Sequence, residues 1–273
     1  MDPLAEVSMS QPFSLHCLGH PRLVAPDGRP VRLKTRKHLA LLVYLAVEPR
    51  VPQRRDRLTT LLWESAPASE GRHSLATAVS VLRAKLGRDR LEGGRDWVRL
   101  TAPDLELDLD RLARGEVLPT DLIPALDVGG FLEDFDIPDA QAFAHWCDAQ
   151  RARWQPRIGD ALASLMDRCR RTGDFHQIEQ YADRMLQIDE LNEQGIRAKM
   201  EARAFAGDRL SALKVYEAWR TQLAEELDAV PTPLLEGIAV RLRHRGLERQ
   251  HTSEIAPVPT DQWKDRPFVG RAA

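Results

Sequence analysis

Side chains that can donate and accept hydrogen bonds recur along one face of the segment EGRHSLATAVSVLRAKLG, residues 70–87. With a helical period of 3.6 residues, His73, Thr77 and Ser80 fall on the same side as small alanines. The other side of this predicted helix is apolar and carries Leu75, Val79, Leu82 and Leu86. Because a hydroxyl group donates and accepts hydrogen bonds and an imidazole donates one, this face can recognise the polar edge of a ligand.

Cations flank the same helical face. Arg72 and Arg83 lie at its edges, while Ala76 and Ala84 leave its middle without bulk. A solvated helix face more often carries long charged side chains, so the small residues predict that another surface approaches closely. Guanidinium groups bind phosphate oxygens, and a helix with a small outer side fits the major groove of DNA, which is about 12 Å wide. The pattern therefore favours a nucleic-acid contact.

The distribution of charge along the chain supports this interpretation. The 273 residues carry a net charge of −2, but residues 29–99 hold 16 Lys and Arg against 7 Asp and Glu, a net of +9, which leaves −11 for the rest. A basic module is thus joined to an acidic remainder. A local excess of positive charge attracts polyanions even when the whole protein is nearly neutral; a basic surface without a partner is the alternative.

The elements that would position this helix begin with a short sheet. The segment FSLHCLG (13–19) alternates apolar and polar residues, and PDGR (26–29) contains an Asp-Gly turn, so we expect an antiparallel sheet. Farther along, LELDLD (105–110) predicts an exposed strand edge with three carboxylates. A calcium site is the alternative there, but the glycine and the terminal glutamate of an EF-hand loop are missing.

Two helices should follow the sheet. The segment TRKHLALLVYLAVEP (35–49), with Thr35 as its cap and Pro49 at its end, is apolar nearly all round, which is typical of a buried helix. The segment PQRRDRLTTLLW (52–63) predicts a second helix with its leucines facing inward. Its first turns carry Arg54, Arg55 and Arg57. These cations oppose the helix dipole, so an external anion such as a phosphate would compensate them.

A hairpin completes this part of the chain, because RLEGGRDWVRL (90–100) predicts two short strands around a Gly-Gly turn. A sheet, three helices and a hairpin form a winged helix-turn-helix, whose third helix enters the major groove and whose hairpin, the wing, reaches the backbone or an adjacent groove. We expect base contacts from His73, Thr77 and Ser80. Phosphate contacts are expected from Lys34, Arg36, Lys37, Arg54, Arg55 and Arg95, and either kind of contact from Arg72 and Arg83.

The segment from LKTRKHLALL at residue 33 to RAKLG at residue 87 resembles the DNA-binding half of the bacterial antibiotic-regulatory-protein activators. Its most specific parts are LLW at 61–63 and SLATAVSVLRAKLG at 74–87. Arg72 and Arg83 stand where that family commonly has arginine, whereas Ala76 and Val81 replace cations that are frequent in the family. The resemblance implies a winged helix similar to that of response regulators.

The second half of the chain predicts an all-α domain of helical repeats. Comparison of the sequence with itself at a lag of 34 residues aligns Gly173-Asp174 with Gly207-Asp208 and Met166 with Met200. It also aligns Ile178, Tyr181, Ala182 and Met185 with Ala212, Val215, Tyr216 and Trp219. This is the tetratricopeptide period, with Gly-Asp at the turn inside each helical hairpin. The aromatic side chains of the repeat are therefore expected in its core rather than in a ligand groove.

Helices are expected at the two ends of this repeat region as well. Residues 161–171 and 196–206 should form the first helices of the two repeats, and residues 232–243 should close the stack, with Thr232 as a cap before Pro233. An irregular third hairpin is expected around PDAQAFAHWCDAQRARW (138–154), kinked before the proline that follows.

This half resembles the bacterial transcriptional activation domain of the same activators, in FLEDF, WCDAQRARW and GDFHQIEQYADRMLQIDELNEQG. The expected domains are a winged helix at 12–110, a linker at 114–130, a tetratricopeptide-like activation domain at 131–248 and a tail at 249–273. The tail segment RPFVGR (266–271) resembles the opening of an ATPase domain, although the sequence has no Gly-x-x-x-x-Gly-Lys-Ser/Thr motif. The resemblance implies a fragment of a longer regulator.

Other function classes find little support in the sequence. Cys17, Cys147 and Cys169 are scattered and odd in number, so we expect a reducing, cytoplasmic compartment. The start shows no signal peptide, and no apolar run is long enough to span a membrane. The spacing of His16, Cys17 and His20 is not a zinc pattern, so strand packing is expected there. Hydrolase motifs are missing, and we expect no enzyme, no cofactor and no metal.

One main hypothesis and one alternative follow. The main hypothesis is a transcriptional regulator, in particular an activator, whose winged helix reads double-stranded promoter DNA and whose repeat domain serves protein interaction, dimerisation or signal relay. It leaves RNA polymerase and a second copy of the chain on DNA open as protein partners. The alternative is a protein-interaction scaffold whose winged helix no longer binds DNA.

Overall fold

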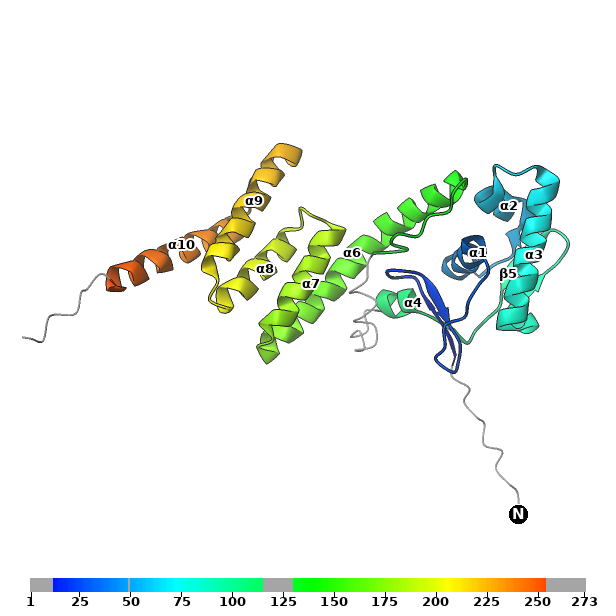
Figure 1. The fold of residues 1–273 in the computed structure, drawn as a ribbon, viewed down its shortest axis with the longest axis horizontal. Helices are drawn as coiled ribbons and strands as arrows, with labels where there is room; N and C mark the ends of the chain where they lie inside the picture. The colour runs from blue at the N-terminus through cyan, green and yellow to red at the C-terminus, as the bar shows by residue number, and fades with distance from the viewer. Residues whose placement is uncertain (1–11, 49, 115–129, 254–273) are drawn as a thin grey trace, which may run out of the picture. The chain divides into compact units, whose positions relative to one another are not determined.

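The computed structural model describes residues 12–48, 50–114 and 130–253. Within these ranges the chain is mainly helical with two small sheets, as the sequence predicts (Figure 1). It forms two compact units, residues 1–198 and 199–273. No helix in the described ranges is both long and apolar enough to cross a membrane. Pro49, nearly all of the predicted linker and most of the predicted tail lie outside these ranges.

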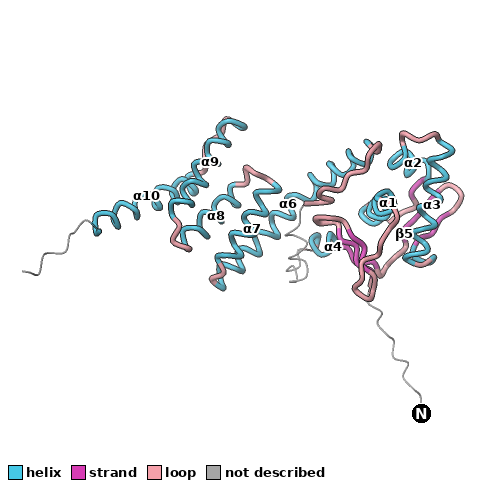
Figure 2. Tube along the Cα trace, viewed as in Figure 1, coloured by secondary structure: helices cyan, strands magenta, loops and turns pink. Residues whose placement is uncertain are grey.

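The first sheet joins strands that lie far apart in the sequence (Figure 2). Strand β1 (Phe13–His16) pairs antiparallel with β2 (Arg22–Val24) and parallel with β6 (Leu105–Leu107). The predicted Asp-Gly turn follows β2 and leads only to an isolated bridge between Val24 and Pro30. The antiparallel pair was therefore predictable from local alternation, whereas the parallel third strand depends on a distant partner.

The predicted exposed strand edge at residues 105–110 is confirmed for residues 105–107 only, because β6 lies at the edge of its sheet with Glu106 exposed. Pairing stops at the end of β6, where helix α4 (Asp108–Ala113) begins. The Asp108 side chain is buried, and its Oδ2 accepts the N–H groups of Cys17 at 2.8 Å and Leu18 at 2.9 Å. These buried N–H groups need an acceptor, which accounts for a carboxylate in an apolar setting. Burial raises the pKa of Asp108 to about 6.

Three helices form the core of the winged helix (Figure 1). Helix α1 (Arg36–Val47) is capped by Thr35, whose Oγ1 accepts the N–H of His38 at 3.4 Å, and most of its side chains are buried. Helices α2 (Arg55–Trp63) and α3 (Ala68–Leu86) pack against α1 and against each other with their predicted leucines inward. The expectation of a buried first helix and two amphipathic ones is confirmed.

A second sheet forms the wing. Strands β4 (Leu91–Gly93) and β5 (Trp97–Leu100) pair antiparallel, which confirms the predicted hairpin. The short strand β3 (Gln53–Arg54) pairs with the other side of β5, so the strand order is β3-β5-β4. The helix predicted over residues 52–63 therefore starts later, and Arg54 lies in a strand beside the wing rather than in a helical turn.

A single helix of 32 residues, α6 (Gln141–Thr172), replaces the irregular hairpin that the sequence predicts around residues 138–154. The helix runs through Pro156 and on into the expected first repeat helix. Trp154 and Ile158, which flank the proline at a spacing of four residues, are both buried. Packing of this continuous apolar face outweighs the loss of one backbone N–H at the proline.

The N-terminal half of α6 packs on the winged helix. The ring of Trp146 lies 5.1 Å from that of Tyr44 in α1, and its Nε1 donates a hydrogen bond to Glu48 Oε1 at 2.7 Å. Phe131 and Phe143 add ring contacts to Trp146 at 5.9 and 5.4 Å. Aromatic pairs at these separations contribute beyond the area that they bury. The winged helix and the start of α6 therefore share one apolar core.

The predicted Gly-Asp turn is present after α6. Gly173 has a φ of +77°, a conformation that favours glycine, and Asp174 caps α7 (Phe175–Ile188) by accepting the N–H of Gln177 at 3.1 Å. Helix α7 packs along α6. The predicted inner face of α7 is buried: Ile178, Tyr181, Ala182 and Met185.

The same turn recurs in the second unit. Helix α8 (Glu193–Phe205) ends before Gly207, which has a φ of +86°, and Asp208 caps α9 (Arg209–Leu227) by accepting a backbone N–H at 3.0 Å. Helix α10 (Pro233–Ser253) starts at its proline, as predicted, and packs against α9. Ala212, Tyr216 and Trp219 are buried and Val215 is half-buried. The aromatic side chains are thus part of the core.

Candidate nucleic-acid interface

The polar face of α3 is exposed. His73, Thr77 and Ser80 all lie at the surface, and Ala76 and Ala84 add little bulk between them. The opposite face of the helix is buried against α1 and α2: Leu75, Val79, Leu82 and Leu86. Apolar packing therefore fixes the helix in the orientation that presents these polar groups outward.

A close contact between α2 and the backbone of α3 at Gly71 sets the position of α3. A Cβ built on Gly71 would lie 2.7 Å from Thr59 Cγ2 and 3.5 Å from Trp63 Cβ, both in α2. Glycine is the residue that lets the two helices come this near. At the other end Gly87, with a φ of +102°, ends the helix and donates its N–H to Arg83 O. Sequence patterns alone did not identify Gly71, because its role depends on a contact with another helix.

An open hollow of about 900 Å³ lies between α3 and the wing. Ser80 and Arg83 of α3 line one side, Gly93 and Trp97 of the wing line the other, and Arg55 reaches it from α2. The structure thus brings together three of the residues predicted to contact DNA, Arg55, Ser80 and Arg83. Its walls come from the two elements that a winged helix presents to DNA.

Two arginines connect the hollow to the wing. Arg83 donates from Nε to Leu91 O at 2.8 Å, and Arg55 donates from Nε to Gly94 O at 3.1 Å. Burial, and after it the positive charge of Arg83, lower the pKa of Arg55, while Asp96 acts in the opposite direction. Both guanidinium groups therefore hold the wing in place and contribute positive charge to the hollow.

The other predicted contact residues fall into two groups. Arg54, Arg72 and Arg95 are exposed, and they lie in β3, in α3 and in the turn of the wing. The remaining three are Lys34, Arg36 and Lys37. They stand at the start of α1 and do not line the hollow.

The cations at the start of α1 have different surroundings. Lys34 is exposed, whereas Arg36 donates to Asp136 O at 3.1 Å, in the segment before α6. The ammonium group of Lys37 lies 5.7 Å from the centre of the Trp63 ring. A cation over an aromatic face is attracted to it, so Lys37 contributes to packing. Of these three side chains, Lys34 is the one best placed to meet a ligand.

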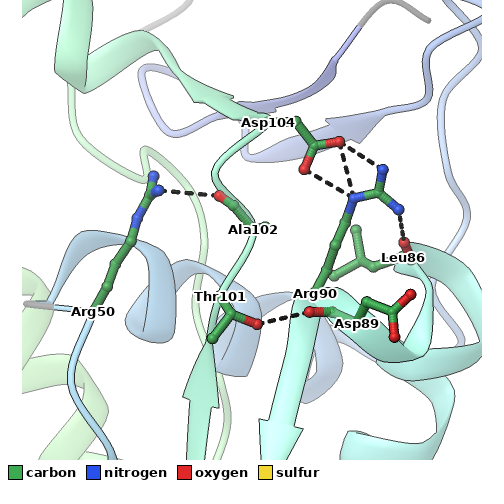
Figure 3. Close-up of polar contacts among 7 residues, drawn as sticks. All are labelled: Arg50, Leu86, Asp89, Arg90, Thr101, Ala102 and Asp104. Atoms are coloured by element: carbon green, nitrogen blue, oxygen red, sulfur yellow. Dashed lines mark hydrogen bonds and ion pairs between the residues drawn. The ribbon is translucent and has the colours of Figure 1, made fainter.

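A charged joint fixes α3 and the wing to the first sheet (Figure 3). Arg90, at the end of the 3₁₀ turn η1 (Arg88–Arg90), donates from Nε and Nη2 to the Asp104 carboxylate at 2.6–3.0 Å. Its Nη1 donates to Leu86 O at 2.7 Å, at the last residue of α3. The hydrogen bond from Arg90 lowers the pKa of Asp104. Together with Asp108 on the other side of β6, Arg90 and Asp104 form what we call the joint.

Two further contacts support the joint (Figure 3). Thr101 donates from Oγ1 to Asp89 O at 2.8 Å, and Arg50 donates from Nη1 to Ala102 O at 3.0 Å. These bonds hold the chain where it passes from the wing to β6. They involve side chain and backbone groups that are distant in the sequence, and sequence analysis did not identify them.

Trp97 and Arg88 line the hollow but were not among the predicted contact residues. Trp97 is half-buried beside Gly94, where a Cβ would lie 2.6 Å from the indole Nε1. An aromatic residue next to Gly-Gly in the predicted hairpin is a signal that could have identified it.

Within the described ranges no group of His, Cys, Asp and Glu side chains could hold a metal ion. Cys17 is buried in the first sheet region, in line with the expected packing role.

Comparisons with known proteins agree with this architecture. Residues 128–243 match the family described as "Bacterial transcriptional activator domain". The curated "Transcriptional regulatory protein EmbR" of Mycobacterium tuberculosis and that of Mycobacterium bovis are each 27% identical to the chain over 272 residues, which cover 86% of this chain and 64% of the relative. The chain thus spans slightly less than two thirds of the length of these relatives.

A solved structure shows a similar fold. "Mycobacterium tuberculosis EmbR in complex with low affinity phosphopeptide" matches with a TM-score of 0.60 and 23% sequence identity, over 85% of this chain and 65% of that one. The phosphopeptide is a ligand of that protein. These findings confirm the resemblance that the sequence predicts: residues 128–243 match a bacterial transcriptional activator domain, and the chain is similar to bacterial transcriptional regulatory proteins.

Proposed function

We propose that the chain is a DNA-binding transcriptional regulator, an activator, that reads promoter DNA with α3 and the wing. The observation that carries this proposal is the exposed polar face of α3 beside a hollow with arginines on its walls. In this arrangement His73, Thr77 and Ser80 contact base edges, and cations at the margin contact the phosphates that run along the groove.

The cations at the margin of this interface form three groups in the proposal. Arg54, Arg55 and Arg95 contact phosphates beside the wing, and Arg72 and Arg83 contact phosphates or bases along α3. The cations near the start of α1, Lys34, Arg36 and Lys37, contribute phosphate contacts at the edge of the interface. Because the last two have intramolecular partners, we expect Lys34 to contribute most of this group.

The helical second half serves protein contacts in this proposal. Similarity to transcriptional regulators along most of the chain supports it, and so does the match of residues 128–243 to an activator domain. RNA polymerase and a second copy of the chain on DNA are the proposed partners, and the cytoplasm is the proposed location. Direct packing of Trp146 in α6 on α1 gives a route by which a partner of this half can affect the winged helix.

Binding of the purified chain to random duplex DNA as a function of salt tests the proposal. Arg54→Ala should weaken binding to all sequences and lower the slope of log affinity against log salt by about 0.9, because one phosphate contact is lost. Glu70→Gln, an exposed residue of α3 without positive charge, is the matched control and should leave the slope unchanged. If the unmodified chain shows no binding to duplex DNA even at low salt, the alternative of a scaffold that does not bind DNA is favoured.

A further inference from the structure

Two guanidinium groups converge in the hollow next to Gly93. A Cβ built on Gly93 would lie 2.9 Å from Arg83 Nη2 and 3.6 Å from Arg55 Nη2, so these two nitrogens lie on the same side of the wing backbone. Each arginine uses its Nε for a wing carbonyl, Leu91 O or Gly94 O. Their terminal nitrogens are therefore left to meet a common acceptor.

The charge of this pair is compensated only in part, by the electrostatic effect of Asp96 on Arg55. Within the described part of the chain, neither Arg55 nor Arg83 has a carboxylate at ion-pair distance; Glu92, which also lines the hollow, pairs with Arg99 at 2.5 Å. Burial, and after it the positive charge of Arg83, lower the pKa of Arg55, and two like charges this close repel each other. Holding them together costs free energy in the unbound chain, and an anion between them would offset that cost.

We propose that Arg55 and Arg83 form one site for a single phosphate group, which in the complex belongs to the DNA backbone. This inference rests on the proposed function and sharpens it, because it assigns both arginines to the same phosphate. A phosphate presents several acceptor oxygens, so it accepts hydrogen bonds from two guanidinium groups at once. The missing side chain of Gly93 keeps the site open. Because both arginines also hold the wing through their Nε atoms, the bound phosphate fixes the wing against α3.

Inorganic phosphate is the first probe, since it tests the site without DNA. Thermal unfolding of the full chain is followed in potassium phosphate and in potassium chloride of equal ionic strength. Phosphate stabilises many proteins by exclusion from their surface, so the quantity of interest is the difference between variants. The unmodified chain should gain a few degrees more in melting temperature than the site variants do, as expected for a ligand that binds the folded state.

Three variants remove the site in different ways. Arg55→Gln and Arg83→Gln each remove one cation, and Gly93→Ala keeps both but places a methyl group against Arg83 Nη2. All three should lose the extra stabilisation by phosphate. Lys85→Gln is the matched control: it removes an exposed cation of α3 that does not line the hollow and has no proposed contact, so the effect should remain. Gly93→Ala keeps both arginines and changes only the space beside their terminal nitrogens, so it tests the site even if removal of an arginine unfolds the wing.

DNA is the second probe, and it distinguishes one shared phosphate from two separate ones. Each of Arg55→Gln and Arg83→Gln should lower the salt slope of duplex binding by about 0.9, and the double variant should also lower it by about 0.9. A double variant that loses about 1.8 would overturn the shared site. An extra phosphate effect that persists in Arg83→Gln and Gly93→Ala, or that is absent from the unmodified chain, would overturn it as well. Phosphate stabilisation without any duplex binding would support the anion site and overturn its assignment to DNA.

Discussion

The arginine of the joint has a carboxylate partner, whereas the two arginines of the hollow have none at ion-pair distance within the described residues. In the joint, Arg90 binds the Asp104 carboxylate through both Nε and Nη2 and caps the end of α3. In the hollow, Arg55 and Arg83 bind only backbone carbonyls and keep their terminal nitrogens together. The same side chain thus serves the fold in one place and is available to a ligand in the other. The presence of a carboxylate within reach makes the difference.

This contrast predicts two classes of variant. Changes in the joint should lower the free energy of unfolding, because they remove intramolecular partners of buried or half-buried groups. Changes on the polar face of α3 should leave stability nearly unchanged and alter DNA binding. The comparison is tested by measuring the free energy of unfolding and the DNA affinity of the same set of variants.

Asp108→Ala should have the largest effect on stability. It leaves the N–H groups of Cys17, Leu18 and Leu109 without their acceptor, at a cost of about 3–5 kcal/mol in the free energy of unfolding at pH 5. Urea denaturation followed by circular dichroism measures this change. Asp108→Asn, which keeps an acceptor oxygen, is the control and should cost less. Equal losses for the two variants would show that the hydrogen bonds are not the cause.

The pH dependence of stability should show a smaller effect of the same residue. Burial raises the folded-state pKa of Asp108 from 3.8 to about 6, so the protonated carboxyl favours folding. Its contribution is fully present below pH 3.8 and is lost as the pH rises through 6, by at most about 3 kcal/mol. The difference in unfolding free energy between the unmodified chain and Asp108→Asn should therefore fall over this interval. A difference that rises or stays constant would contradict the assignment.

Asp104→Asn should cost about 1 kcal/mol in the free energy of unfolding. The side chains of Arg90 and Asp104 are 33% and 41% exposed, so solvent screens the pair and limits its contribution. Duplex affinity should fall by a small factor only, because no DNA contact is removed. A loss of DNA binding as large as that of the hollow variants would show that the joint determines the geometry of α3 and the wing as well as stability.

Thr77→Ala should have the smallest effect on stability, within about 0.5 kcal/mol, because its side chain is exposed. It should instead change the preference between base pairs by about 1–3 kcal/mol, which competition among duplexes of different sequence measures. A uniform loss of affinity for every duplex would place Thr77 against a phosphate instead of a base.

Local patterns predicted much of the fold. The spacing of Leu75, Val79 and Leu82 identified the buried side of α3, and the repeated Gly-Asp pairs identified the turns before α7 and α9. These features depend on helical periodicity and on the conformation of single residues, which a sequence shows directly. The irregular hairpin around residues 138–154 was not correct, because a proline signals a break locally while burial of Trp154 and Ile158 keeps the helix continuous.

Residue type and charge in the sequence determined which face of α3 is polar and which module is basic. Only the tertiary structure decided which cations remain available to a ligand. Arg55 and Arg90 look alike in the sequence, but Arg90 meets Asp104 across the joint and Arg55 meets Arg83 beside Gly93. The physical reason is that charge interactions depend on distance and burial, and for these residues both are set by contacts between α3, the wing and the first sheet.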